Sequence, residues 1–140
     1  MTAVVLDSSF LAAVVIDEAL SPFARTTFTS LAGARLIAPL LLNWEFSSVL
    51  LKKLRQKDIE WPEAEALASV FERFEVAMDD APGDAVRLGT ITLSRRWTLS
   101  AYDAAYLELS LRLGADLATL DEKLTKGALS EGLTVHSPFA

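Results

Sequence analysis

The stretch Ala3-Val4-Val5-Leu6-Asp7-Ser8-Ser9, which leads into an apolar run at residues 10–16, decides the fold of this chain. Four apolar residues that stop at an aspartate are typical of a strand buried on both faces. The run that follows predicts a short helix, with Ser8 or Ser9 as its N-cap. A buried strand that leads directly into a helix is the first half of a parallel βαβ unit.

The same alternation continues along the chain. The sequence predicts four further short strands, at residues 36–38, 76–78, 117–119 and 133–135. It predicts helices over residues 22–32, 41–56, 61–74, 82–97, 101–113 and 122–129, with Ser21 as the N-cap of the first of these and Pro22 in its first turn. Strands separated by helices favour an α/β domain with a parallel sheet covered on both faces. No linker or repeat interrupts residues 1–140, so we expect a single domain.

Composition excludes several kinds of chemistry. The 140 residues include 13 Lys or Arg, 19 Asp or Glu, a single histidine and no cysteine, which gives a formal net charge of −6. Without cysteine there is no thiolate metal site, iron–sulfur cluster or disulfide, and His136 alone cannot build a multi-histidine site. Carboxylates are therefore the main reactive groups. The acidic balance argues against a generally basic nucleic-acid binder, although a local basic patch is compatible with it.

Nothing in the sequence predicts export or membrane insertion. The longest apolar runs, residues 10–16 and 36–42, are far shorter than the roughly 20 residues that cross a bilayer. The N-terminal apolar stretch is not preceded by Lys or Arg and contains Asp7, which argues against a signal peptide. We therefore expect a cytoplasmic location and no contact with a membrane.

Two aspartates follow predicted strands, and two further acids lie early in predicted helices. Asp7 and Asp121 come after the first and fourth strands, at the edge of a parallel sheet where active sites form. Both also precede a helix, so N-capping is the structural alternative for each. Asp103 lies three residues after Ser100, and this spacing is that of a capping box, which is its own structural alternative.

Glu45 is harder to explain as a structural residue. Its neighbours one turn away, Leu41 and Val49, are apolar, and no basic residue follows within a helical turn. A partly desolvated carboxylate is costly unless it is paired or binds a cation. The alternative is that Glu45 reaches solvent along the edge of the apolar stripe. Clustered carboxylates with little histidine suit Mg²⁺ or Mn²⁺, but spacing alone leaves open whether Asp7, Glu45, Asp103 and Asp121 converge.

These segments resemble, in order, the motifs of PIN-domain ribonucleases, most closely the VapC-type toxins of toxin–antitoxin pairs. The matching segments are Val4-Val5-Leu6-Asp7-Ser8-Ser9, Glu45 in its helix, Tyr102-Asp103-Ala104-Ala105-Tyr106 and Leu117-Ala118-Thr119-Leu120-Asp121, and the resemblance extends to residues 132–135. It implies a three-layer α/β/α PIN-like fold with about five parallel strands. It also implies a Mg²⁺- or Mn²⁺-dependent endoribonuclease that leaves a 5′-phosphate and a 3′-hydroxyl.

The resemblance assigns roles to individual residues. It implies that Asp7, Glu45, Asp103 and Asp121 form an acidic metal-binding and catalytic quartet. Asp7, Asp103 and Asp121 would be direct ligands, whereas Glu45 would bind metal or orient the attacking water. Two neighbouring hydroxyls, those of Ser9 and Thr119, would support the acids, with ordinary turn and cap bonding as their alternative.

Three further residues depart from the motif or lie beside it. Asp116 stands where many relatives have an apolar residue or proline, and we expect it at the entrance of the fourth strand, away from the site. Trp44 and Phe46 make the surroundings of Glu45 bulkier than expected, which would narrow substrate access.

The resemblance also implies partners, namely RNA, a cognate antitoxin and a second copy of the chain in a homodimer. Candidate phosphate contacts are Lys52-Lys53-Leu54-Arg55-Gln56-Lys57, Arg95-Arg96, Lys123 and Lys126, the first group being equally suited to a solvated helix C-terminus. Trp61 and Trp97 are candidates for base stacking, although we favour a core or interface role. The apolar residues 10–16 and 40–51 suit either an antitoxin groove or plain core, and we favour core.

Three other functions remain open at this stage. A receiver domain also places aspartates at strand ends, but it would carry paired acids after the first strand and a lysine after the fifth. A haloacid-dehalogenase-like phosphatase would carry Asp-x-Asp where this chain has Asp7-Ser8-Ser9. The third alternative is a catalytically weak PIN module that binds RNA or protein, against which the presence of all four acids argues.

Overall fold

The computed structural model describes residues 2–80 and 83–140. The strands are β1 (Ala3–Leu6), β2 (Arg35–Pro39), β3 (Ala77–Asp79), β4 (Asp116–Ala118) and β5 (Val135–His136). The helices are α1 (Ser8–Val15), α2 (Ser21–Ser30), α3 (Leu41–Arg55), α4 (Trp61–Glu72), α5 (Asp84–Trp97), α6 (Ala101–Leu113) and α7 (Glu122–Ser130). Every predicted element is present, with ends shifted by at most two residues where they are described. The predicted start of the fifth long helix, at Pro82, lies outside the described residues.

The sheet is parallel throughout, as the alternation of strands and helices predicts. Its strand order is β3-β2-β1-β4-β5, so that β1 is the central strand. The chain builds β2 and β3 on one side of β1 and then returns to build β4 and β5 on the other side. Leu6 is aligned with Ala118, which brings the carboxyl ends of β1 and β4 side by side. Ligands of open α/β sheets bind at this kind of topological switch point.

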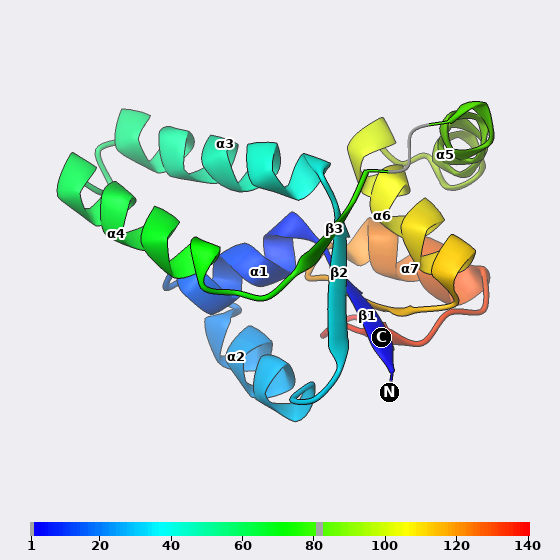
Figure 1. The fold of residues 1–140 in the computed structure, drawn as a ribbon, viewed down its shortest axis with the longest axis horizontal. Helices are drawn as coiled ribbons and strands as arrows, with labels where there is room; N and C mark the ends of the chain where they lie inside the picture. Colours follow the sequence, from blue (N-terminus) through cyan, green and yellow to red (C-terminus); the bar gives the residue numbers. More distant parts are fainter. Residues whose placement is uncertain (1, 81–82) are drawn as a thin grey trace.

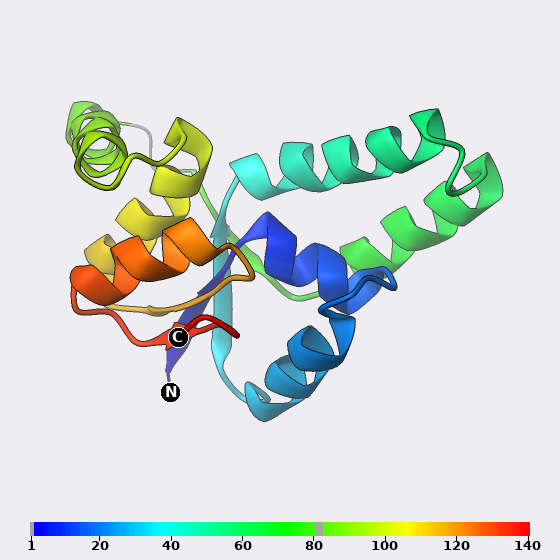
Figure 2. The same ribbon diagram turned by 180° about the vertical axis from the view of Figure 1, so that it is seen from behind.

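The molecule has the three layers of an α/β/α fold. Helices α1–α4 lie on one side of the sheet and α5–α7 on the other, as the two opposite views show (Figures 1 and 2). Three successive residues of β1, Val4, Val5 and Leu6, are completely buried, because helices cover both faces of this central strand. Among the described residues, no helix has the length and apolarity needed to span a bilayer.

Helices α3 and α4 lie side by side and extend away from the sheet (Figures 1 and 2). A small second core holds them together and joins them to α1: the ring of Phe46 stacks on Phe71 with centroids 4.4 Å apart, and Ile16 and Leu50 pack around them. Phe46 is 2% exposed. The expectation that Phe46 narrows access to Glu45 is therefore wrong, because its side chain serves the core, whereas Trp44 remains exposed.

Two predicted caps differ in the structure. Asp7, rather than Ser8 or Ser9, caps α1, because its carboxylate accepts the hydrogen bond of the Phe10 amide. Ser21 is the first residue of α2 and not its N-cap. Its hydroxyl instead bridges the preceding loop, accepting from the Glu18 amide and donating to the Ile16 carbonyl, both at 2.8 Å. Ser8, Ser9 and Ser21 all lie inside the helices that they were expected to cap.

Candidate acidic site at the carboxyl edge of the sheet

Asp7 directly follows β1 and is 2% exposed. Its Oδ1 accepts hydrogen bonds from the Phe10 amide, at 2.9 Å, and from the Ser9 hydroxyl, at 2.7 Å. Its Oδ2 accepts from the hydroxyl of Thr119. Burial raises the pKa of Asp7 to about 7; these three hydrogen bonds lower the pKa, and the nearby Asp103 raises it. Capping and a place in the candidate site thus coexist in one side chain.

Ser9 and Thr119 connect Asp7 to the loop after β4. While donating to Asp7, the Ser9 hydroxyl accepts from the Leu120 amide at 3.1 Å. The Thr119 hydroxyl likewise accepts from the Asp121 amide at 3.0 Å. Both hydroxyls therefore do more than local turn bonding, because each fixes the acid that ends β1 relative to the loop that carries Asp121.

The other two aspartates begin helices at the same edge. Asp121 caps α7, where its Oδ1 accepts from the Leu124 amide at 2.7 Å. Asp103 lies in the first turn of α6, and the Ser100 hydroxyl accepts from its amide at 3.1 Å, as the predicted spacing requires. Burial raises the pKa of Asp103, and the negative charges of Asp121 and Glu45 raise it further. The structural alternatives are thus present for both residues, alongside electrostatic coupling among the acids.

Glu45 is held by a residue that sequence reasoning missed. Its Oε1 accepts a 2.6 Å hydrogen bond from the hydroxyl of Tyr106, 61 positions along the chain. Tyr106 is completely buried, and burial together with Glu45 raises the pKa of its hydroxyl well above the usual range. Its position three residues after Asp103 on one helix was the available signal, since such residues share a helix face. Glu45 is half-buried and anchored, rather than free in solvent.

Asp103 is the residue that links the four acids, since its charge acts on Asp7 and is acted on by both Glu45 and Asp121. No ion pair involves any of the four in the described part of the chain. Nor do three His, Asp or Glu side chains within residues 2–80 and 83–140 lie close enough to form a ready-made metal site. The donor set nevertheless fits a hard divalent cation, because several carboxylates share one edge without a basic neighbour to balance them.

Asp116 lies away from this edge, as expected. It is the first residue of β4, whereas the four acids lie at or beyond the carboxyl ends of β1 and β4 or on the helices there. Its Oδ2 is 3.0 Å from Nε2 of His136, so the only histidine of the sequence also has a structural partner. Asp116 is therefore a suitable control residue, because it is an aspartate that lies outside the candidate site.

The candidate RNA-binding aromatics and cations separate into packed and exposed groups. Trp97 is packed against Gly127 and donates its Nε1–H to Glu131 at 2.8 Å, which confirms a core role. Trp61 is 64% exposed and so is not a core residue, and an interface role for it stays a prediction. Arg96 also binds Glu131, at 2.6 Å, whereas no ion pair involves Lys123 in the described chain.

Fold and acids together define an α/β/α domain with an oxygen-donor site at the switch point of its sheet. Residues 4–128 match the family model of the PIN domain, and the chain belongs to this family. Membership of the PIN family excludes two of the alternative functions, the receiver domain and the haloacid-dehalogenase-like phosphatase. No curated protein matches the chain significantly.

Solved structures share the fold at low sequence identity. PAE2754 from Pyrobaculum aerophilum aligns with a TM-score of 0.69 and 23% identity, over 96% of this chain and 90% of that one. VapC20 of Mycobacterium tuberculosis, described as a sarcin–ricin-loop-cleaving toxin, aligns with a TM-score of 0.67 and 17% identity, over 88% of this chain and 93% of that one. FitAcB from Neisseria gonorrhoeae aligns with a TM-score of 0.68 and 13% identity, over 94% of this chain and 95% of that one. At these identities the likeness establishes the fold alone.

Proposed function

We propose that this chain is a Mg²⁺- or Mn²⁺-dependent endoribonuclease that acts as the toxin of a toxin–antitoxin pair. The observation that carries the proposal is the set of four carboxylates at the switch point, which no basic side chain of the described residues neutralises. Membership of the PIN family supports it. So does the shared fold of VapC20, a sarcin–ricin-loop-cleaving toxin.

In this proposal Asp7, Asp103 and Asp121 hold the divalent cation, with Glu45 beside them. When bound, such a cation stabilises the negative charge that develops at phosphorus and on the leaving oxygen. Asp7 contributes a carboxylate already oriented by three hydrogen bonds. Since the Tyr106 hydroxyl occupies Oε1 of Glu45, Oε2 is left to accept a proton from the attacking water. The water oxygen then bonds to phosphorus as the bond to the ribose 3′ oxygen breaks, and that oxygen takes up a proton from solvent to become the 3′-hydroxyl.

The test compares cleavage by the parent protein and by matched aspartate variants. The protein is purified free of any partner and incubated with structured RNAs and Mg²⁺ or Mn²⁺. We expect cutting that requires the metal and falls by at least about 100-fold in Asp7→Asn and Asp103→Asn, the size of loss seen when one electrostatic contact to a transition state is removed. Asp116→Asn, at the other edge of the sheet, is the control and is expected to cut like the parent.

Two outcomes would contradict the enzyme assignment. Equal cutting by Asp7→Asn and the parent would indicate a contaminating nuclease. RNA binding without cutting by the parent, under every metal condition, would favour the binding-module alternative.

A cytoplasmic location belongs to the same proposal, since the RNA substrate is found there.

The antitoxin and the homodimer are part of the same proposal. Residues 10–13 are buried in the core, so the core interpretation favoured for this run is confirmed, and it offers little surface to a partner. Leu40 and Leu51, in contrast, are 48% and 44% exposed. Co-expression with a small DNA-binding protein encoded beside this gene is expected to suppress RNA cleavage, and sedimentation of the purified chain tests for the homodimer.

A further inference from the structure

A pocket of about 470 Å³ opens beside the carboxylate of Glu45. One face of α3 forms its long wall: Leu41, Glu45, Ser48 and Lys52 recur at helical spacing and all line it. The pocket therefore runs lengthwise along α3 from the acidic edge. Because Glu45 belongs both to this pocket and to the candidate site, whatever fills the pocket lies next to the place of the proposed cleavage.

Two large aromatic side chains border the pocket and remain largely in water. Trp44 of α3 is 70% exposed, and Tyr102 in the first turn of α6 is 61% exposed. They come from different helices, yet both line the same pocket. Exposed apolar surface grouped in this way marks a site of interaction, because its burial on binding is favourable. These two rings do not belong to the hydrophobic cores against which α3 and α6 pack, because other residues form those cores.

Charge differs between the two ends of the pocket. Glu45 lies at one end, and Lys52, seven residues later, lies about 10 Å further along the helix axis. Lys52 is exposed and takes part in none of the ion pairs of the described chain, in contrast to its neighbour Lys53, which lies 3.8 Å from Glu18. In a chain with a net charge of −6, an unpaired cation at the end of an aromatic pocket favours an anionic ligand.

We propose that this pocket binds an unpaired nucleobase of the RNA next to the bond that is cut, stacked on Trp44 and Tyr102, with the adjoining phosphate on Lys52. A nucleotide supplies both an aromatic face and an anion, and unpaired bases of single-stranded RNA stack on exposed aromatic side chains in this way. The inference rests on the proposed function and adds the residues that hold the base beside the scissile bond, namely Trp44, Tyr102 and Lys52.

The first test measures binding alone, in an Asp7→Asn background that prevents cutting. A short single-stranded oligoribonucleotide is titrated into the protein while tryptophan fluorescence is recorded. We expect quenching that survives Trp61→Phe and disappears in Trp44→Phe. Trp44→Ala is expected to weaken binding about 5- to 150-fold, the range for loss of one base–aromatic stack. Trp61→Ala is the matched control, since Trp61 is 64% exposed but lies on α4 outside the pocket, and its affinity is expected to stay unchanged.

The second test replaces single nucleotides of the RNA by an abasic analogue. When the nucleotide next to the cut is abasic, the protein that keeps Trp44 is expected to bind the RNA about 5- to 150-fold more weakly than the intact RNA. Trp44→Ala is expected to bind both RNAs with the same affinity. With Asp7 restored, Trp44→Ala is expected to lower kcat/KM for the base-bearing RNA only. The thermal midpoint of Trp44→Ala is measured alongside, and an exposed site predicts little change.

The outcomes separate the pocket from the proposed function. If Asp103→Asn abolishes cutting but Trp44→Ala binds and cuts like the parent, the stacking proposal is overturned and the nuclease stands. If Trp44→Ala keeps its RNA affinity but loses a partner protein, the pocket is a protein-binding site and the proposal is equally overturned. If Asp103→Asn cuts like the parent, the proposed function fails, and loss of RNA binding in Trp44→Ala would still support a base-binding pocket.

Discussion

The buried carboxylate of Asp7 has both a structural role and a role in the candidate site. It caps α1, accepts two hydroxyl hydrogen bonds and faces the charge of Asp103, all while 2% exposed. Burial favours its protonated form, and the hydrogen-bond donors favour its charged form. A cation at this edge would shift the balance to the charged form, so the metal and the proton compete for the same residue.

The stability of the metal-free protein is therefore expected to fall as pH rises. The pKa of Asp7 is about 7 in the folded chain against an ordinary value of 3.8, so the native state binds the extra proton between these values. The stabilisation is complete below about pH 4 and is lost as pH rises to about 7, a change of up to about 4 kcal/mol. The raised pKa of Asp103 acts in the same direction. Urea unfolding in EDTA across this range measures it.

Asp7→Asn supplies the control for this pH dependence. An amide cannot titrate, so the variant is expected to show a much flatter profile over the same range, whereas Asp17→Asn, on the surface, is expected to keep the parent profile. A parent protein whose stability rises between about pH 4 and 7 would contradict the argument.

Tyr106→Phe tests whether the tyrosine positions Glu45. The change removes only the hydroxyl that donates to Oε1 at 2.6 Å. Loss of a partner that orients a metal-site residue costs about 10- to 100-fold in metal affinity or activity. We expect a loss in that range in the rate of RNA cleavage at saturating Mn²⁺, with the parent fold retained. Tyr102→Phe, which keeps its exposed ring on the same helix, should cut like the parent; equal losses in both variants would argue against a positioning role.

Individual acids were predictable from the sequence, but their partners were not. Asp7 and Asp121 follow strands β1 and β4, so their common edge follows from local patterning and the rules of parallel sheets. The contact between Tyr106 and Glu45 spans 61 positions and depends on how α3 and α6 pack, which periodicity does not encode. The exposed Trp44 and the buried Phe46, two positions apart, were likewise indistinguishable until the second core was seen.

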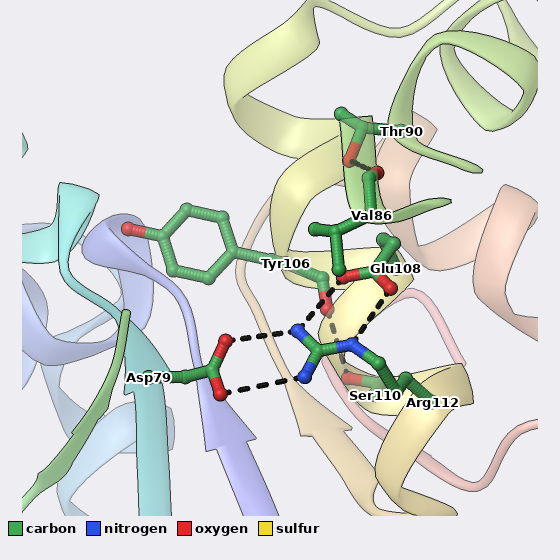
Figure 3. Close-up of polar contacts among 7 residues, drawn as sticks. All are labelled: Asp79, Val86, Thr90, Tyr106, Glu108, Ser110 and Arg112. Atoms are coloured by element: carbon green, nitrogen blue, oxygen red, sulfur yellow. Dashed lines mark hydrogen bonds and ion pairs between the residues drawn. The ribbon is translucent and has the colours of Figure 1, made fainter. Parts of the chain in front are cut away.

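At the scale of elements, one arginine joins the sheet to helix α6. Arg112 binds Glu108 one turn earlier through two hydrogen bonds of 2.8 and 3.0 Å, and it binds the carboxylate of Asp79, the last residue of β3 (Figure 3). The hydroxyl of Tyr106, on the same helix, takes no part in this network (Figure 3). Different residues of α6 thus serve different tasks: Arg112 fixes the end of β3, and Tyr106 holds Glu45.

Arg112→Ala is expected to destabilise the fold by about 2 kcal/mol. The change leaves Glu108, which is 9% exposed, without its cation. Removal of one partner from a fully buried pair costs about 3–5 kcal/mol, and the cost here is smaller because Arg112 and Asp79 are partly exposed. Chemical denaturation measures the difference. Arg87→Ala breaks an exposed pair with Asp84 and should change stability by less than about 0.5 kcal/mol; equal effects of the two changes would refute the argument.

The elements themselves were well predicted, because their apolar patterns are strong and glycine or proline punctuates them. The errors are at their ends. β5 was expected at residues 133–135 and lies at Val135–His136, because its extent is set by pairing with β4, a long-range contact. The order of strands in the sheet, with β1 at its centre, likewise depends on long-range pairing.

At the scale of the whole molecule, the acidic charge is concentrated by the fold. Four of nineteen acids belong to the candidate site, and the remaining fifteen nearly balance thirteen Lys and Arg residues. The surface away from the site is therefore closer to neutral than the net charge of −6 suggests, which makes contact with RNA less unfavourable.

Divalent metal is expected to stabilise the whole fold through this site. A cation that binds only the native state adds about 2.7 kcal/mol at one hundred times its Kd, which raises Tm by several degrees. The measurement is a thermal melt with Mg²⁺ or Mn²⁺ against K⁺ at equal ionic strength. Asp103→Asn is expected to lose the increase and Asp116→Asn to keep it, so a shift retained in Asp103→Asn would place the metal elsewhere.

The pairing of β1 with β4 also determines when the site first exists. Asp7 and Thr119, which bond to each other, are 112 positions apart, so a ribosome delivers Asp7 long before its partner. A nascent chain that ends before α6 carries Asp7 and Glu45 but neither Asp103 nor Asp121, and its first strand still lacks β4. On the proposed function this order of synthesis acts as a safeguard, because a nascent chain would carry the full set of four acids only once Asp121 has been made.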